Sequence, residues 1–300
     1  MKITKALNGF ESNSMKLLYF LFGINFSILA QNGSEIYLLK LTKSNVGYGT
    51  DNPVNITNRT GYDNQPGFHP TKPIIYFSSQ TNGQTDIWAY DYELKKLSQI
   101  TNTEDSEYSP TVTPDQKHIS CIVQRKSNGD QDLVKFSIEN PQKTEILLES
   151  QKAGKFGYHA WSSDNELVTF VLGEPNTLQL FENQSKSGKI LGENIGRSLH
   201  YVKSKKAFSF VEKDGETWNV KLLNPKNKTV TTFGEALKDS ECYNAWNDEG
   251  LLFGSKDKEL FFFETKSKIW KNVTLPSGFP YNKISRLAIK GNTLALVINE

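Results

Sequence analysis

A four-part pattern repeats along the chain about every 44 residues, and this repeat restricts the fold more than any other feature of the sequence. Each copy contains short runs rich in β-branched and aromatic residues, separated by Gly, Pro, Asn or Asp, which is the pattern expected of consecutive short strands. One apolar or aromatic residue anchors the first run of each copy, and these anchors are Phe68, Val112, Trp161, Tyr201, Trp246 and Leu287.

Residues 62–101 hold the clearest copy, in which Asn82-Gly83 separates the second run from the third. An Asn-Gly pair between two such runs predicts a two-residue hairpin, since both central positions of a type I′ turn need a positive φ. Asn128-Gly129 and Asp214-Gly215 predict hairpins at the same place in later copies. Helical periodicity is nearly absent, so the sequence predicts an all-β fold.

The last copy breaks off after two runs, at 284–289 and 293–298. Runs that match its missing third and fourth strands lie near the other end of the chain, at 35–41 and 53–57. A single small four-stranded sheet cannot cover both of its faces, but sheets stacked around an axis bury one another. We therefore predict a six-bladed β-propeller with four-stranded antiparallel blades, in which N-terminal and C-terminal strands together close the last blade.

The N-terminal region has the layout of an export signal. Residues 15–30 begin with Met-Lys, continue as an apolar run and end in Ala30. A basic start, an apolar core and a small residue at the cleavage point are typical of a secretory signal. We predict a signal peptide at 1–30, with Met15 as an alternative start of translation, and a single propeller domain at 31–300 in the periplasm or outside the cell. A buried strand or an anchor helix is the alternative for the apolar run.

Charge and cysteine content exclude several classes of protein. The chain has 35 Lys and Arg against 33 Asp and Glu, a net charge of +2. Removal of residues 1–30 takes away three lysines and one glutamate and leaves no net charge, so we expect no nucleic-acid partner, which would require concentrated positive charge. We also expect no membrane span once the signal is removed. Cys121 and Cys242 are too few for a disulfide scaffold; two separate buried thiols are favoured over a bridge.

The sequence lacks the local motifs of common enzymes and metal proteins. It contains no His-Glu-x-x-His and no paired Cys-x-x-Cys, so neither a metal site nor a cofactor is expected. It also has no Gly-x-Ser-x-Gly turn of the kind that presents a hydrolase nucleophile. No catalytic residue is therefore predicted. A non-catalytic role is favoured, although a site assembled from several blades would leave no local motif.

Three segments of the first full copy carry a resemblance to a known family. The string Gln65–Pro70, followed by the runs at 75–79 and 86–91, resembles the repeat of the TolB-like propellers, also described as WD-repeat-like. The resemblance covers about six units and is weakest around Tyr201 and Leu287. TolB proper carries an α/β domain before its propeller. We expect none here, so the resemblance implies a stand-alone exported propeller, and TolB's partners are not carried over.

The resemblance also implies where a ligand would bind, because the inner strands of such propellers start at the mouth of an axial channel. The residues just before the anchors then surround that mouth, and they are Gln65, Ser109, Tyr158, His159, Ser198, Tyr243, Asn244, Ser285 and Arg286. This ring is polar and, apart from Arg286, uncharged. We predict a non-catalytic scaffold that binds a protein or peptide partner of the cell envelope. A carbohydrate-active enzyme or glycan-binding propeller with its site at the channel mouth is the alternative.

Overall fold

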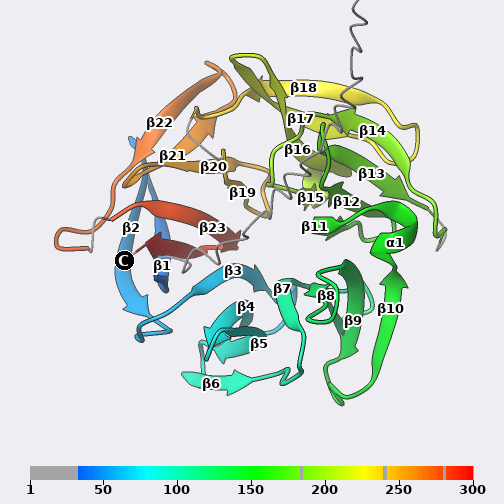
Figure 1. Cartoon of the computed structure of the whole chain (residues 1–300). Coiled ribbons are helices and arrows are strands. Elements are labelled where there is room, and N and C mark those ends of the chain that lie inside the picture. Colours follow the sequence, from blue (N-terminus) through cyan, green and yellow to red (C-terminus); the bar gives the residue numbers. More distant parts are fainter. Residues whose placement is uncertain (1–32, 183–184, 239–241, 280–281, 300) are drawn as a thin grey trace, which may run out of the picture. The chain divides into compact units, whose positions relative to one another are not determined.

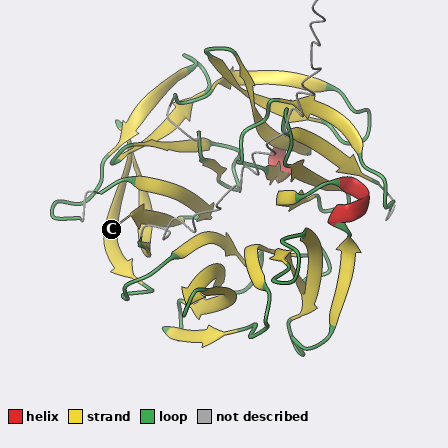
Figure 2. Cartoon of the chain, viewed as in Figure 1, coloured by secondary structure: helices red, strands yellow, loops and turns green. Residues whose placement is uncertain are grey.

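The computed structural model describes residues 33–182, 185–238, 242–279 and 282–299. In that part of the chain, 24 strands form six four-stranded antiparallel sheets arranged around an axis (Figure 1). The described helical segments are the short helix α1 (Ser150–Ala153) and the 3₁₀ turn η1 (Lys203–Lys205), as Figure 2 shows. The predicted six-bladed, all-β propeller is thus confirmed. The predicted signal peptide at 1–30 lies outside the described residues.

Blades 1 to 3 each consist of four strands that follow one another in the sequence. Blade 1 contains β3 (Asp63–Phe68), β4 (Ile74–Thr81), β5 (Gln84–Asp91) and β6 (Lys96–Gln99). Blade 2 contains β7 (Ser106–Val112), β8 (His118–Gln124), β9 (Gln131–Ser137) and β10 (Thr144–Leu148). Blade 3 contains β11 (Phe156–Trp161), β12 (Leu167–Val171), β13 (Thr177–Phe181) and β14 (Lys189–Glu193).

Blades 4 and 5 are built in the same way, whereas blade 6 combines both ends of the domain. Blade 4 contains β15 (His200–Val202), β16 (Ala207–Asp214), β17 (Thr217–Leu223) and β18 (Val230–Glu235). Blade 5 contains β19 (Asn244–Trp246), β20 (Leu252–Lys256), β21 (Glu259–Glu264) and β22 (Ile269–Val273). Blade 6 contains β23 (Ile284–Lys290), β24 (Thr293–Asn299), β1 (Ser34–Ser44) and β2 (Gly47–Asn55).

The ring closes in blade 6 as the sequence predicts. Strand β1 pairs antiparallel with β24, with Ile36 opposite Val297, and β2 follows at the outer edge. The predicted fourth strand at 53–57 overlaps the outer strand β2 only at residues 53–55, because β2 spans Gly47–Asn55. A two-residue turn between the paired Ser44 and Gly47 starts this strand earlier than its β-rich residues suggest.

Two of the predicted hairpins illustrate how far turn residues determine local structure. Asn82 has a φ of 53° and Gly83 a φ of 82°, the left-handed conformations that a type I′ turn requires. The hairpin at Asn128-Gly129 is longer, since β8 ends at Gln124 and β9 begins at Gln131. Of that Asn-Gly pair only Gly129, with a φ of 71°, is left-handed. Two hydrogen bonds fix this wider loop: the Asp130 N–H donates to the Asn128 side-chain oxygen, and the Gly129 N–H donates to the Arg125 carbonyl.

The hydrophobic core lies between adjacent blades. One of its clusters joins Phe170 and Leu178 of blade 3 to Phe208, Phe210 and Leu223 of blade 4, all almost completely buried. Burial of one such aromatic side chain contributes about 1.5–3 kcal/mol. Comparable clusters fill the other gaps around the ring, so each blade is stable only against its neighbours. Cys121 and Cys242 are buried in two different clusters of this core and form no disulfide.

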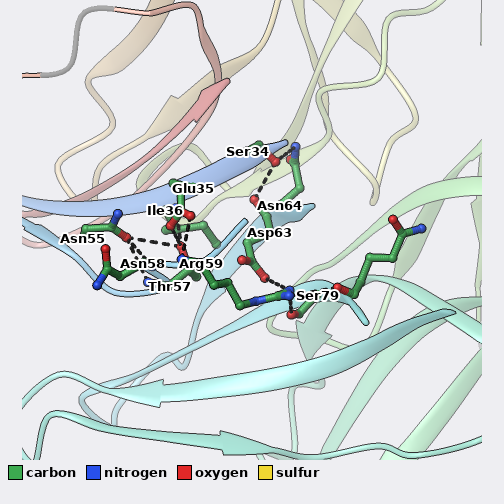
Figure 3. A network of polar contacts seen from close by, with 11 residues as sticks. Ser34, Glu35, Ile36, Asn55, Thr57, Asn58, Arg59, Asp63, Asn64 and Ser79 are labelled. Carbon is green, nitrogen blue, oxygen red and sulfur yellow. Dashed lines mark hydrogen bonds and ion pairs between the residues drawn. The ribbon is translucent and has the colours of Figure 1, made fainter. Parts of the chain in front are cut away.

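A polar network fastens blade 6 to blade 1 (Figure 3). Glu35 on β1 accepts hydrogen bonds from the Thr57 hydroxyl at 2.5 Å and from the Arg59 backbone N–H at 2.8 Å. The Arg59 guanidinium in turn contacts the Asp63 carboxylate of β3 at 2.7 Å. Asp63 has no exposed surface, and burial raises its pKa. Hydrogen bonds from Ser79 and Arg59 and the charge of Arg59 lower it, but by less. The network therefore holds a buried acid that depends on Arg59 for its ionised form.

The junction between blades 1 and 2 uses a related arrangement of threonine and buried acid. The Thr101 hydroxyl accepts a hydrogen bond from the Ile87 N–H at 2.8 Å and donates one to Glu107 at 3.1 Å. Asp86 lies against Glu107, and both acids are buried. Burial, with a smaller contribution from the charge of Asp86, raises the pKa of Glu107 to about 8, and burial also raises the pKa of Asp86. Near neutral pH the two carboxyl groups therefore hold a proton between them.

Candidate functional site

A cavity of about 420 Å³ lies on the axis, lined by the inner strands and the segments next to them. Its walls include eight of the nine residues that the sequence places at the channel mouth: Gln65, Ser109, Tyr158, His159, Ser198, Tyr243, Asn244 and Arg286. This volume falls in the usual range for ligand pockets of proteins. The structure thus brings these residues together, and their role in binding remains a prediction.

Irregular backbone in the inner strands aims side chains into this cavity. The pairing of the first two strands shifts register in four blades, near Gln65, Ser109, Phe156 and Ser285. Gln65 has a φ of 58° and Ser109 a φ of 56°, both left-handed conformations that are uncommon for residues other than glycine. Bulges of this kind redirect side chains and are frequent next to functional sites.

The most distinctive group in the cavity is a cluster of one arginine and two tyrosines from three different blades. Arg286 of β23 donates hydrogen bonds from Nη2 to the hydroxyls of Tyr158 on β11 and of Tyr243 beside β19, both at 2.7 Å. The centre of the guanidinium also lies 5.0 Å from the Tyr158 ring and 4.2 Å from the Tyr243 ring, within the range of cation–π attraction. The cluster thus spans the axis from blade 3 to blades 5 and 6.

The cluster perturbs the acid–base properties of its members. Burial disfavours the charge of Arg286, but Tyr158, Tyr243 and Tyr62 outweigh it and raise the pKa of the arginine above its usual value. Burial alone would raise the pKa of Tyr158, but the charge of Arg286 and its hydrogen bond, with a further contribution from Arg197, lower it. The site therefore keeps a permanent positive charge and favours a negative charge beside it.

The charge of the cavity comes from its arginines. Arg197 and Arg286 both line it, whereas the described lining residues include no aspartate or glutamate. The two histidines in the wall add no charge near neutral pH, because burial lowers the pKa of His159 to about 3 and that of His200 to about 4. Among the described lining residues, Arg286 therefore supplies a positive charge that an anionic group can approach.

Several of the predicted site residues connect neighbouring blades. The Gln65 side-chain carbonyl accepts hydrogen bonds from the Ser109 backbone N–H at 2.6 Å and from Ser78 at 2.9 Å, which joins blade 1 to blade 2. The Ser198 hydroxyl accepts a hydrogen bond from the Asn244 N–H at 3.2 Å, which joins the start of blade 4 to blade 5. These contacts make the cavity wall rigid and leave fewer of the predicted residues for direct ligand contact.

His159 has the same connecting role between blades 2 and 3. Its Nε2 lies 2.7 Å from the Ser120 hydroxyl, which also accepts a hydrogen bond from Trp161 Nε1 at 2.9 Å and donates one to the Thr111 carbonyl at 3.1 Å. Because the single hydroxyl proton of Ser120 goes to Thr111, the network assigns the proton of neutral His159 to Nε2. His159 therefore packs and hydrogen-bonds within the wall.

The sequence prediction of the cavity needs one correction and one addition. Ser285 is not among the lining residues: it lies in the register shift between Ile284 and Arg286, and bulges of this kind redirect side chains. Its hydroxyl instead donates to the Val297 carbonyl at 3.4 Å. Arg197 lines the cavity but was not predicted. Its position directly before Ser198, one residue from the predicted ring, was the available signal.

Two further features are absent from the described residues. No group of three or more His, Cys, Asp or Glu side chains there is placed to hold a metal ion. None of the helices in the described part of the chain has the length and apolar character needed to cross a bilayer.

Comparison with known proteins identifies the architecture. No protein-family model matches the sequence, and no curated protein matches it. A solved structure of a putative TolB from Agrobacterium tumefaciens superposes with a TM-score of 0.66 over 90% of this chain and 99% of that chain, at 8% identity. The fold is that of the TolB-like six-bladed propellers. TolB from Acinetobacter baumannii gives a TM-score of 0.60 at 15% identity over 80% of this chain, which spans only 63% of that TolB.

The TolB-like fold is shared with enzymes. A gluconolactonase from Xanthomonas campestris superposes with a TM-score of 0.61 over 88% of this chain and 95% of that chain, at 7% identity. At such identities the similarity establishes the fold alone, because propellers of one architecture carry unrelated functions. The function of this TolB-like propeller has to be argued from its own cavity.

Proposed function

We propose that this chain is a non-catalytic binding propeller that holds a segment of a protein or peptide partner in its axial cavity. The observation that carries the proposal is the cluster of Arg286, Tyr158 and Tyr243, which offers a fixed charge and two aromatic rings inside a cavity of about 420 Å³. Tyrosine and arginine are the residues most enriched where proteins bind other proteins tightly. A cavity of this size admits a short chain segment and excludes a folded domain.

The rigidity of the wall supports a binding role. Hydrogen bonds of Gln65, His159 and Ser198 connect neighbouring blades at the level of the cavity. A wall that is ordered before the ligand arrives loses little conformational entropy when the ligand binds. With the predicted signal at 1–30, the proposed site of action is the periplasm or the exterior of the cell, where the partner would be a cell-envelope protein.

A variant that fills the cavity tests the proposal. Thr111 lines the cavity on β7 and is not a member of the arginine–tyrosine cluster, so Thr111→Trp should obstruct the site and leave the cluster in place. Thr232→Trp on the exposed edge strand β18 is the matched control. Purified residues 31–300 in the three forms would be compared for proteins that cross-link to them in a cell-envelope extract, after thermal unfolding has shown that each is folded.

The expected result is a partner that cross-links to the wild type and to Thr232→Trp but not to Thr111→Trp. The cross-linked peptide would map to an extended segment of that partner. A partner captured equally by all three forms would refute the cavity as the binding site.

One observation favours the alternative of a carbohydrate-active enzyme. Tyr158 has a pKa lowered by Arg286, so its hydroxyl gives up its proton more readily than that of an ordinary tyrosine. Trp161 and Trp246 in the same wall offer aromatic surface to a sugar ring. A turnover screen on sugar lactones and oligosaccharides distinguishes the two functions. Turnover that disappears in Tyr158→Phe would replace the binding proposal with the enzymatic one.

A further inference from the structure

We infer that the segment bound in the cavity carries a carboxylate, and that Arg286 is the residue that binds it. The inference rests on the proposed function, because it specifies the chemistry of the same cavity. Its starting point is geometric: Arg286 contributes a guanidinium to the axial cavity, yet both of its hydrogen-bonded neighbours are phenols. The described part of the chain provides it with no carboxylate.

A partly buried guanidinium without an anion is an unusual arrangement. Moving a charge out of water is costly unless an opposite charge and hydrogen bonds replace the lost hydration. The two tyrosine oxygens satisfy Nη2 of Arg286 but carry no charge of their own in the neutral form. None of the described ion pairs involves Arg286, in contrast to Arg59 and Arg125 at the blade junctions, which bind Asp63 and Asp132. A ligand carboxylate would supply the missing charge.

The hydrogen-bonding groups of the cluster match a carboxylate. None of the described residues accepts a hydrogen bond from Nε or Nη1 of Arg286, so three of its five N–H groups are left to donate to a ligand. Nη2 already donates to both tyrosines, so a carboxylate would accept its hydrogen bonds from Nε or Nη1, and bonds of this charged kind are the strong ones. The Tyr158 oxygen accepts a hydrogen bond from Arg286, so its own proton is left to donate.

Tyr158 and Tyr243 act as positioning residues for Arg286. They come from blades 3 and 5, on either side of an arginine from blade 6, and each contacts the guanidinium both through its hydroxyl and through its ring. Fixing a long side chain before the ligand arrives removes the entropy loss that binding would otherwise incur. The cluster is therefore arranged to present a single orientation of Arg286 to the carboxylate.

The carboxylate of a peptide has two sources, an Asp or Glu side chain and the free C-terminus, and the test separates them. An array of random heptapeptides would be prepared in three matched forms. The first contains Asp or Glu and has an amidated C-terminus; the second replaces these residues by Asn and Gln; the third has Asn and Gln with a free C-terminal carboxylate. Oligouronates form a fourth arm, since a sugar acid offers the same group.

We expect wild-type residues 31–300 to bind peptides of the first or third form and not their amide counterparts. Arg286→Met should weaken this binding by at least about thirtyfold, because removing one partner of a buried charge pair has a large effect. Lys203→Met removes the same charge from the exposed 3₁₀ turn η1 and is the matched control, which should bind as the wild type does. Thermal unfolding checks that each variant is folded.

Tyr243→Phe separates positioning from general stability. It keeps the ring contact with Arg286 and loses only the hydroxyl, so we expect carboxylate peptides to bind about three- to tenfold more weakly. The same change in the Arg286→Met background should have no further effect. A purely structural role for Tyr243 would instead weaken binding equally in both backgrounds.

The possible failures are distinguishable. One outcome would be that neutral peptides bind the wild type, that Thr111→Trp blocks this binding and that Arg286→Met does not. In that case the cavity binds peptides, but the carboxylate inference is wrong. If no peptide of any form binds, the proposed function and this inference are both refuted. If only oligouronates bind, and Arg286→Met abolishes that binding, the ligand is a glycan and the peptide assignment is overturned.

Discussion

Replacing Glu107 by glutamine should flatten the dependence of stability on alkaline pH. The pKa of Glu107 rises from its usual value of 4.5 to about 8 in the folded protein, chiefly through burial. A carboxyl group whose folded pKa is raised stabilises the fold fully below its unfolded pKa, and this contribution is lost as the pH rises through the folded value. Integrated between pH 6.5 and 9, the wild type should lose about 2 kcal/mol of unfolding free energy from this group.

Glutamine imitates the protonated acid, so Glu107→Gln should not show that loss. Its amide can still donate to Asp86, and Thr103 can redirect its hydroxyl to the Asp105 carbonyl, which already lies 3.1 Å away. Urea denaturation of residues 31–300 at pH 6.5, 7.5, 8.5 and 9 measures the effect. Glu104→Gln, an exposed position in the same loop, is the control and should follow the wild type. Parallel curves for Glu107→Gln and the wild type would show that the buried acid pair does not hold a proton.

Three further predictions concern the core, the blade junction and acid pH. Phe210→Ala, at a fully buried position between blades 3 and 4, should lower the free energy of unfolding by about 3–5 kcal/mol in urea titrations. The control Val230→Ala, on an outer strand, should change it by less than about 0.5 kcal/mol. Arg59→Met should lower the free energy of unfolding by about 2 kcal/mol at pH 7, less than for a fully buried pair because Arg59 is 32% exposed. Adding Asp63→Asn should recover part of this loss, and a double mutant equal to the sum of the two single effects would contradict the coupling. The pKa of His159 is about 3 in the folded protein, below its usual value of 6.5. Its contribution to the free energy of unfolding is therefore present above pH 6.5 and falls by about 3 kcal/mol towards pH 4. His159→Gln should make that decline shallower in melting curves at pH 4 and 7.

The fold could be predicted because the repeat is encoded in local patterns. Each anchor, from Phe68 to Leu287, lies on the inner strand of its blade, and the apolar run at 35–41 completes the blade of the C-terminal strands. Details that depend on loop length were harder. The turn at Asn45-Val46 starts β2 well before the β-rich residues, and the loop after Gln124 widens although it contains an Asn-Gly pair. Neither length follows from propensity alone.

The site was predictable in position and less so in chemistry. Counting back from the anchors finds Tyr158, Tyr243 and Arg286, but nothing in the sequence indicates that these three meet across the axis at hydrogen-bonding distance. Their contact depends on the radius of the ring and on bulges such as that before Arg286. The register shift at Ser285 takes that residue out of the cavity wall, and Arg197 enters the wall from outside a predicted strand.

The pairing of β1 with β24 has a consequence for the order in which the molecule can form. During synthesis β1 leaves the ribosome first among the strands, yet its inner neighbour β24 is made last, so blades 1 to 5 must wait with an open gap beside blade 1. Contacts this distant in sequence slow folding, because a long loop has to close before they form. Until the last residues emerge, the edge of β1 and the buried faces around it stay open to other chains, and exposed edges and apolar faces of this kind promote aggregation.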